Sequence, residues 1–315
     1  MSTDVSLSRS HHSTRRTGSG AALVLAAGLL WGTTGTSATF APPGTSPLAI
    51  GAATMGLGGL LLFLTCARPS LRVLTASRRH LRLAVAGAVC VAVYPLTFYT
   101  SMSMAGVAIG TVVSIGASPV FAALFEWLGD GTRLSGRWVV ATAATVLGCG
   151  LLVGAGAETP AATGRVLPGV LLALVAAASY AGYTYLATRL MRPGRPSRSV
   201  MGAMFGLGAV LLLPVLAVTS GDLLTSRAGW LVVGYLAVVP MFLAYLLFGA
   251  GIRRVGASAG TTLSVCETVV ATVLGVLVVG ERLGPVSWAG VALVVAGLAT
   301  LTLRLGASGR HRPKR

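Results

Sequence analysis

Apolar runs long enough to cross a bilayer follow one another through almost the whole chain. Of its 315 residues, 54% are hydrophobic and only 10% are charged, too few charges to cover a water-soluble protein of this size. A membrane-crossing helix needs about 20 apolar residues. The sequence therefore predicts an all-α polytopic membrane protein with ten transmembrane helices. The predicted spans are residues 19–40, 46–67, 82–103, 106–128, 136–155, 167–189, 199–219, 229–250, 257–279 and 286–304.

The basic residues lie between these runs and distinguish the two sides of the membrane. With a cytoplasmic N-terminus, 21 of the 24 Lys and Arg residues fall in predicted cytoplasmic segments, and the exceptions are Arg165, Arg227 and Arg282. This is the positive-inside pattern. It predicts two cytoplasmic termini, and it accounts for the net charge of +17 without a nucleic-acid partner. Because all but one of these residues are Arg, as is typical of a GC-rich bacterial genome, we expect the plasma (inner) membrane.

Two stretches about 150 residues apart, 106–138 and 256–288, resemble each other. The loop before the first stretch is uncharged, whereas the loop before the second carries Arg253 and Arg254, so the positive-inside pattern places the copies in opposite orientations. Inverted repeats of this kind build secondary transporters. The identical pairs are Gly106/Gly256, Gly110/Gly260, Thr111/Thr261, Ser114/Ser264, Val120/Val270, Leu124/Leu274 and Trp138/Trp288.

The repeat predicts how the chain is organised and where its helices pack. We expect a disordered cytoplasmic tail at 1–18, a first repeat at 19–155, a second at 156–304 and a basic cytoplasmic tail at 305–315. A cleaved signal peptide is rejected, because its removal would leave nine spans and put the basic segments on the wrong side. Glycines four residues apart allow close helix approach in membranes. The predicted packing positions are Gly106, Gly110, Gly256 and Gly260, with a further pair at Gly202 and Gly206.

Two motifs resemble those of a known family. WGT at 31–33 and ETVVATVLGVLVVGERL at 267–283, within ten spans in two halves, resemble the EamA family of the drug/metabolite transporter superfamily. The resemblance covers about 19–304 and implies two inverted five-helix repeats around a central cavity, moving small metabolites or drugs, usually outward. The first half departs from the pattern, with GDGTRL in place of GERL. Asp130 is therefore only an approximate counterpart of Glu281.

Glu267 is the acidic residue predicted near the middle of the membrane, ten residues into the ninth span. An ionised side chain there costs about 3 kcal/mol or more, so it must face a partner or a wet cavity. It could bind a cationic or zwitterionic group or carry a coupling proton. A protonated carboxyl with a structural hydrogen bond is the alternative. The aligned residue in the first half is Ala117, so the acid breaks the symmetry.

Aromatic and hydroxyl side chains inside the spans are further candidates for a cavity lining. A tyrosine in mid-span needs a hydrogen-bond partner or water, which favours the interior of the bundle. Serine and threonine recur at equivalent positions of the fourth and ninth spans. The candidate substrate or coupling residues besides Glu267 are Trp31, Tyr94, Ser114, Ser118, Tyr180, Tyr183, Tyr245, Ser264 and Thr268.

These features predict a secondary transporter. Residue types that the sequence lacks narrow the class of substrate and of site. No Lys or Arg is predicted in mid-membrane, which disfavours phosphate-rich substrates and favours neutral, zwitterionic or cationic small molecules. The four histidines fall in tails or loops and the four cysteines form no CxxC pair, so we expect no enzyme, metal or cofactor. The expected partners are a small-molecule substrate, the lipid bilayer and, if transport is coupled, protons. A monomer or homodimer, a channel-like permease and a non-transporting scaffold stay open.

Overall fold

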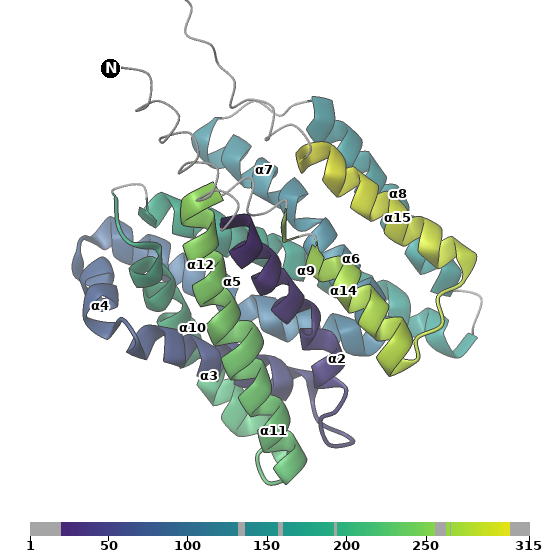
Figure 1. Cartoon of the computed structure of the whole chain (residues 1–315), viewed down its shortest axis with the longest axis horizontal. Coiled ribbons are helices and arrows are strands. Elements are labelled where there is room, and N and C mark those ends of the chain that lie inside the picture. Colours follow the sequence, from purple (N-terminus) through teal and green to yellow (C-terminus); the bar gives the residue numbers. More distant parts are fainter. Residues whose placement is uncertain are drawn as a thin grey trace, which may run out of the picture.

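The computed structural model describes residues 20–131, 136–156, 160–191, 194–255, 263–264 and 266–302. Every regular element in these ranges is a helix (Figure 1). The first helix starts at Gly20, turns at Thr33 and continues as α2 (Thr34–Ala38). The other elements are α3 (Pro47–Leu64), α4 (Ala67–Thr75), α5 (Arg78–Ala105), α6 (Val107–Gly116), α7 (Ser118–Asp130), α8 (Gly136–Gly156), α9 (Pro160–Met191), α10 (Ser197–Thr219), η1 (Gly221–Leu223), α11 (Arg227–Leu236), η2 (Ala237–Leu243), α12 (Ala244–Val255), α14 (Cys266–Leu274), η3 (Gly275–Val279) and α15 (Pro285–Thr302).

Seven helices in the described part of the chain are long and apolar enough to cross a membrane. Two further apolar helices, Cys266–Val279 and Pro285–Gly297, are shorter. The predicted ninth span begins at residue 257, but residues 256–262 and 265 lie outside the described ranges, so only its second part is seen. The chain is thus a multi-pass membrane protein, while the count of ten stays a prediction. The seven are Gly20–Ala38, Pro47–Leu64, Arg78–Ala105, Val107–Asp130, Arg165–Met191, Ser197–Thr219 and Arg227–Gly251.

Local sequence explains where several helices begin and end. Ser46 precedes α3, accepts a hydrogen bond from the Leu48 backbone N–H at 3.3 Å, and is followed by Pro47 at the first helical position. A serine cap and a proline at that position both favour helix initiation. At their C-terminal ends, Gly131 closes α7 and Gly280 closes η3, each with a positive φ that suits glycine.

Most of the core lies between helices that pack in long pairs. α5 packs along α9 and α3 along α10, and a large apolar cluster fills the space between these helices and α11. α8 and α15 lie side by side at one edge of the molecule (Figure 1). A second apolar cluster joins them to α6 and α9. The two clusters flank the region where α6, α14 and the first helix meet.

Glycines bring the backbones of these helices together. A Cβ at Gly59 of α3 would lie 2.7 Å from the carbonyl oxygen of Phe205 in α10. A Cβ at Gly110 would lie 2.8 Å from Cγ of Met102, and one at Gly206 2.8 Å from Phe63. These are distances that real Cβ atoms do not adopt, so close packing requires glycine there. Gly256 and Gly260, the other predicted pair, lie outside the described residues.

Glu281 connects two segments far apart in the sequence. Its carboxylate accepts hydrogen bonds from the backbone N–H groups of Val107 and Ala108, the latter at 3.0 Å. These amides open α6 and have no partner within the helix, so a negative charge is favourable there. Gly106, with φ of +93°, leaves room for the carboxylate, since a Cβ would lie 3.0 Å from its Oε1. Glu281 thus caps the start of another helix, α6.

Gly59→Ala tests the close packing of α3 on α10. The added methyl group meets the Phe205 backbone, so we expect a loss of about 1–3 kcal/mol in the free energy of unfolding. Gly234→Ala in α11 is the matched control, because a Cβ there meets nothing within 4 Å, and it should be neutral or stabilising by up to about 1 kcal/mol. Thermal unfolding of both purified variants in detergent measures the difference. Equal melting temperatures would contradict this packing.

Candidate functional site

A small cavity lies inside the bundle, between residues 31–115 of the first half and 180–267 of the second. Its volume is about 40 Å³, space for about one water molecule. Ligand pockets usually measure about 300–1,000 Å³, so this central cavity must widen before it can hold a metabolite. Its lining consists of Trp31, Thr34, Thr54, Met55, Tyr94, Pro95, Phe98, Tyr99, Ile115, Tyr180, Pro240, Met241, Tyr245 and Glu267.

Glu267 supplies the acidic group of the central cavity. It lies in the first turn of α14, where the helix dipole favours negative charge, and its side chain is 7% exposed. In the ranges that the structure describes, the ion pair is Arg189 with Asp130 at 3.5 Å, and no cation pairs with Glu267. A buried carboxyl without a cation is stable only when it is protonated or when a ligand supplies the charge.

Aromatic rings surround this carboxyl. Trp31 meets Tyr245 edge to face with ring centroids 5.1 Å apart, and Tyr94 meets Tyr180 at 5.8 Å. Tyr183 packs against Tyr180 at 5.2 Å, and its hydroxyl lies 2.7 Å from that of Tyr245. Tyr183 therefore supports the lining from behind. The predicted residues Trp31, Tyr94, Tyr180, Tyr245 and Glu267 all line the cavity.

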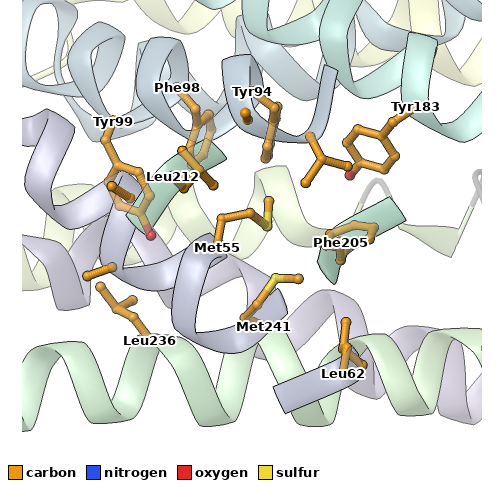
Figure 2. Close-up of a cluster of buried hydrophobic side chains, with 14 of the residues drawn as sticks. Met55, Leu62, Tyr94, Phe98, Tyr99, Tyr183, Phe205, Leu212, Leu236 and Met241 are labelled. Atoms are coloured by element: carbon orange, nitrogen blue, oxygen red, sulfur yellow. The ribbon is translucent and has the colours of Figure 1, made fainter. Parts of the chain in front are cut away.

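The side chains next to these rings come from several helices. Figure 2 shows Tyr94 and Phe98 of α5 on one side, with Met55 of α3 and Met241 of η2 facing them. Thioether side chains are flexible and adapt to different shapes. Aromatic faces attract cations, most strongly away from water. One carboxyl among such rings suits an ammonium group.

The predicted hydroxyl residues are buried but lie outside the described lining. Ser114 is fully buried, and its Oγ has no hydrogen-bond partner among the described residues. Ser118 donates to the carbonyl oxygen of Ile115 at 2.8 Å. Ser264 and Thr268 are 4% and 1% exposed, next to Glu267 in the chain. The four hydroxyls thus sit behind the cavity wall.

The fourth predicted span is broken next to Ser118, and the Ser118 hydroxyl compensates for the hydrogen bond lost there. Pro119 has no N–H, so it cannot bond the carbonyl of Ile115 one turn earlier, and the helix divides into α6 and α7 at Ala117. The Ser118 hydroxyl takes the place of the missing donor. Ala117 is the position aligned with Glu267, which itself lies at the start of α14. Interrupted helices are typical of transporter binding sites.

Several lining residues were not among the predicted set. Thr54 and Tyr99 share a hydrogen bond at 3.2 Å, and Pro240 lies in the π-helix η2. Short π-helices are frequent at functional sites. A proline inside a span, such as Pro240, indicates an irregular helix. A single threonine in the glycine-rich run of α3, such as Thr54, does not by itself indicate a cavity lining.

Comparison with known proteins identifies the family. The model of the EamA-like transporter family matches residues 18–154 and again 167–303. The chain belongs to the EamA-like transporter family. An EamA-like protein of Bacillus subtilis (strain 168), "Uncharacterized transporter YwfM", is 35% identical over 285 residues, which cover 89% of this chain and 92% of that protein. "Uncharacterized inner membrane transporter YedA" of Escherichia coli (strain K12) is 29% identical over 138 residues, 43% of this chain and 44% of YedA.

A solved structure has the same EamA-like fold. A chain titled "Crystal structure of protein" superposes with a TM-score of 0.62, covering 93% of this chain and 99% of that one at 21% identity. This identity supports the fold alone. The family match and the transporter-named relatives support a membrane transporter, as the sequence motifs predicted.

Ser118→Ala tests the break between α6 and α7. The change leaves the Ile115 carbonyl without its hydroxyl donor in a buried site, so we expect a loss of about 1–3 kcal/mol in the free energy of unfolding. Ser103→Ala is the control, because its hydroxyl also donates to a carbonyl, that of Thr100, but from an exposed position. Thermal unfolding in detergent measures both. A Ser118 variant as stable as the Ser103 variant would refute this role.

Proposed function

We propose that the protein is a secondary transporter that exports small cationic or zwitterionic metabolites or drugs across the plasma membrane by alternating access. The observation that carries the proposal is Glu267, a carboxyl buried among aromatic rings with no cation paired to it in the described part of the chain. An ammonium group on the substrate would supply the missing charge. Neutral substrates would leave the carboxyl without a partner, so we disfavour them.

The size of the central cavity supports alternating access over a channel. At about 40 Å³ it is too small for a metabolite, as expected of a closed state between two open ones. The helix break at Ala117 and the π-helices η2 and η3 offer places where the bundle can bend. We further propose ten helices in two inverted repeats, with both termini cytoplasmic, because the Lys and Arg residues follow that arrangement.

The same carboxyl suggests how transport could be driven. A proton and a cationic substrate would compete for Glu267, since a single negative charge can be neutralised by either one. A substrate leaving on the outer side would then be replaced by a proton, which returns inward. This mechanism couples export to the inward proton gradient without a nucleotide.

Glu267→Gln tests the proposal directly. The amide keeps the size of the side chain but cannot neutralise a cation, so we expect transport of cationic substrates to fall at least about 30-fold. Uptake of radiolabelled amines and quaternary ammonium compounds into proteoliposomes, driven by an imposed pH gradient, measures it. Glu126→Gln is the control, because Glu126 is exposed on α7, and it should transport normally. Full activity of the Glu267 variant would overturn the proposal.

A further inference from the structure

A second, larger cavity lies next to the central one. Its volume is about 300 Å³, at the lower end of the range for small-molecule pockets. Its walls are the end of α2, the connection at 39–46, and the adjoining ends of α3, α5 and α6. By the positive-inside pattern this connection is extracellular, so we name this space the outer cavity.

The two cavities follow each other along the same helices. On α3, Thr54 lines the central cavity and Ile50, one turn earlier, lines the outer one. On α5, Phe98 lines the central cavity and Met102, one turn later, lines the outer one. Tyr99 lines both. The cavities are therefore two stages of one path, and Tyr99 lies where they meet.

Tyr99 is held in this position by ring packing against Phe98, with centroids 5.6 Å apart, and by one hydrogen bond. Its side chain is 4% exposed, and its hydroxyl lies 3.2 Å from Oγ1 of Thr54. The Thr54 hydroxyl donates its proton to the carbonyl oxygen of Ile50 at 2.7 Å, so Tyr99 must be the donor to Thr54. A change at either residue removes the same bond.

The lining of the outer cavity suits the same class of molecule as Glu267. Thr39, Thr45 and Ser103 each donate their hydroxyl proton to a backbone carbonyl, at 2.7, 2.6 and 2.8 Å. Their oxygens are therefore left as acceptors. The described lining contains no charged side chain. Acceptor oxygens without a fixed charge favour an ammonium group and bind it weakly enough to release it.

We propose that the outer cavity is a second substrate site for organic cations and that Tyr99 is the gate between it and the Glu267 site. The inference rests on the proposed transport function. It adds a second binding site on the extracellular side, which is already large enough for a small cation. It also assigns the closing of the central cavity to one side chain, Tyr99.

Cysteine accessibility tests the gate without measuring transport. In a variant lacking the native cysteines, Ser103→Cys reports on the outer cavity and Ile115→Cys on the central one. A membrane-impermeant reagent, trimethylammonium-ethyl methanethiosulfonate, is added outside intact expressing cells. We expect rapid labelling at 103 and slow labelling at 115. Tyr99→Phe and Thr54→Val should each raise the rate at 115 about fivefold, and the double variant no further.

Tyr235→Phe is the control for the loss of a tyrosine–threonine hydrogen bond, here a half-buried one. The Tyr235 hydroxyl lies 2.8 Å from Oγ1 of Thr33, which itself donates to the Leu30 carbonyl, and Tyr235 is not in the described lining of either cavity. Its loss should leave labelling at 115 unchanged. Equal labelling at 103 and 115 in the parent, or no response to either gate variant, would overturn the gate.

Protection from labelling tests the outer substrate site. Choline should slow labelling at 103, whereas its neutral isostere 3,3-dimethyl-1-butanol should not, and protection should persist with Glu267→Gln. Equal protection by both compounds, or by neither, would overturn the site. Labelling at 103 only in inside-out vesicles would overturn its extracellular placement. If Glu267→Gln transports normally while this pattern holds, the proposed coupling through Glu267 fails and the gated path stands.

Discussion

The burial of one carboxyl group inside an apolar bundle is the constraint on which the site depends. Glu267 is 7% exposed at the start of α14, and the ion pair of the described chain lies elsewhere, between Arg189 and Asp130. A lipid-embedded protein keeps such a group only where a proton or a ligand can neutralise it. The aromatic rings around Glu267 also favour a positively charged ligand, because their faces attract positive charge.

Close packing surrounds this site. Glycines let α3 approach α10 and let α6 approach α5, and the Glu281 carboxylate joins the end of η3 to the start of α6. The helices that carry Ile115 and Glu267 are thus tied together at one end. A break at Ala117 divides the segment that carries Ile115 near the cavity.

The sequence predicted the helical membrane fold and the residues whose chemistry is costly in a membrane. Glu267, Trp31 and Tyr94 line the cavity. An acid or a polar aromatic group in mid-span needs a hydrogen-bond partner or a wet cavity. The predicted serines are buried outside the described lining, and Ser118 donates to the carbonyl oxygen of Ile115. Contacts between distant helices, such as Glu281 with α6, depend on packing that no local pattern contains.

Carbodiimide labelling measures the state of Glu267 most directly. Dicyclohexylcarbodiimide enters apolar sites and reacts with protonated carboxyl groups, and mass spectrometry of the purified protein locates the adduct. We expect modification at Glu267, slowed by choline and not by 3,3-dimethyl-1-butanol. An unreactive Glu267, or a reaction that choline leaves unchanged, would contradict the claim that this carboxyl is exchanged between a proton and a cationic substrate.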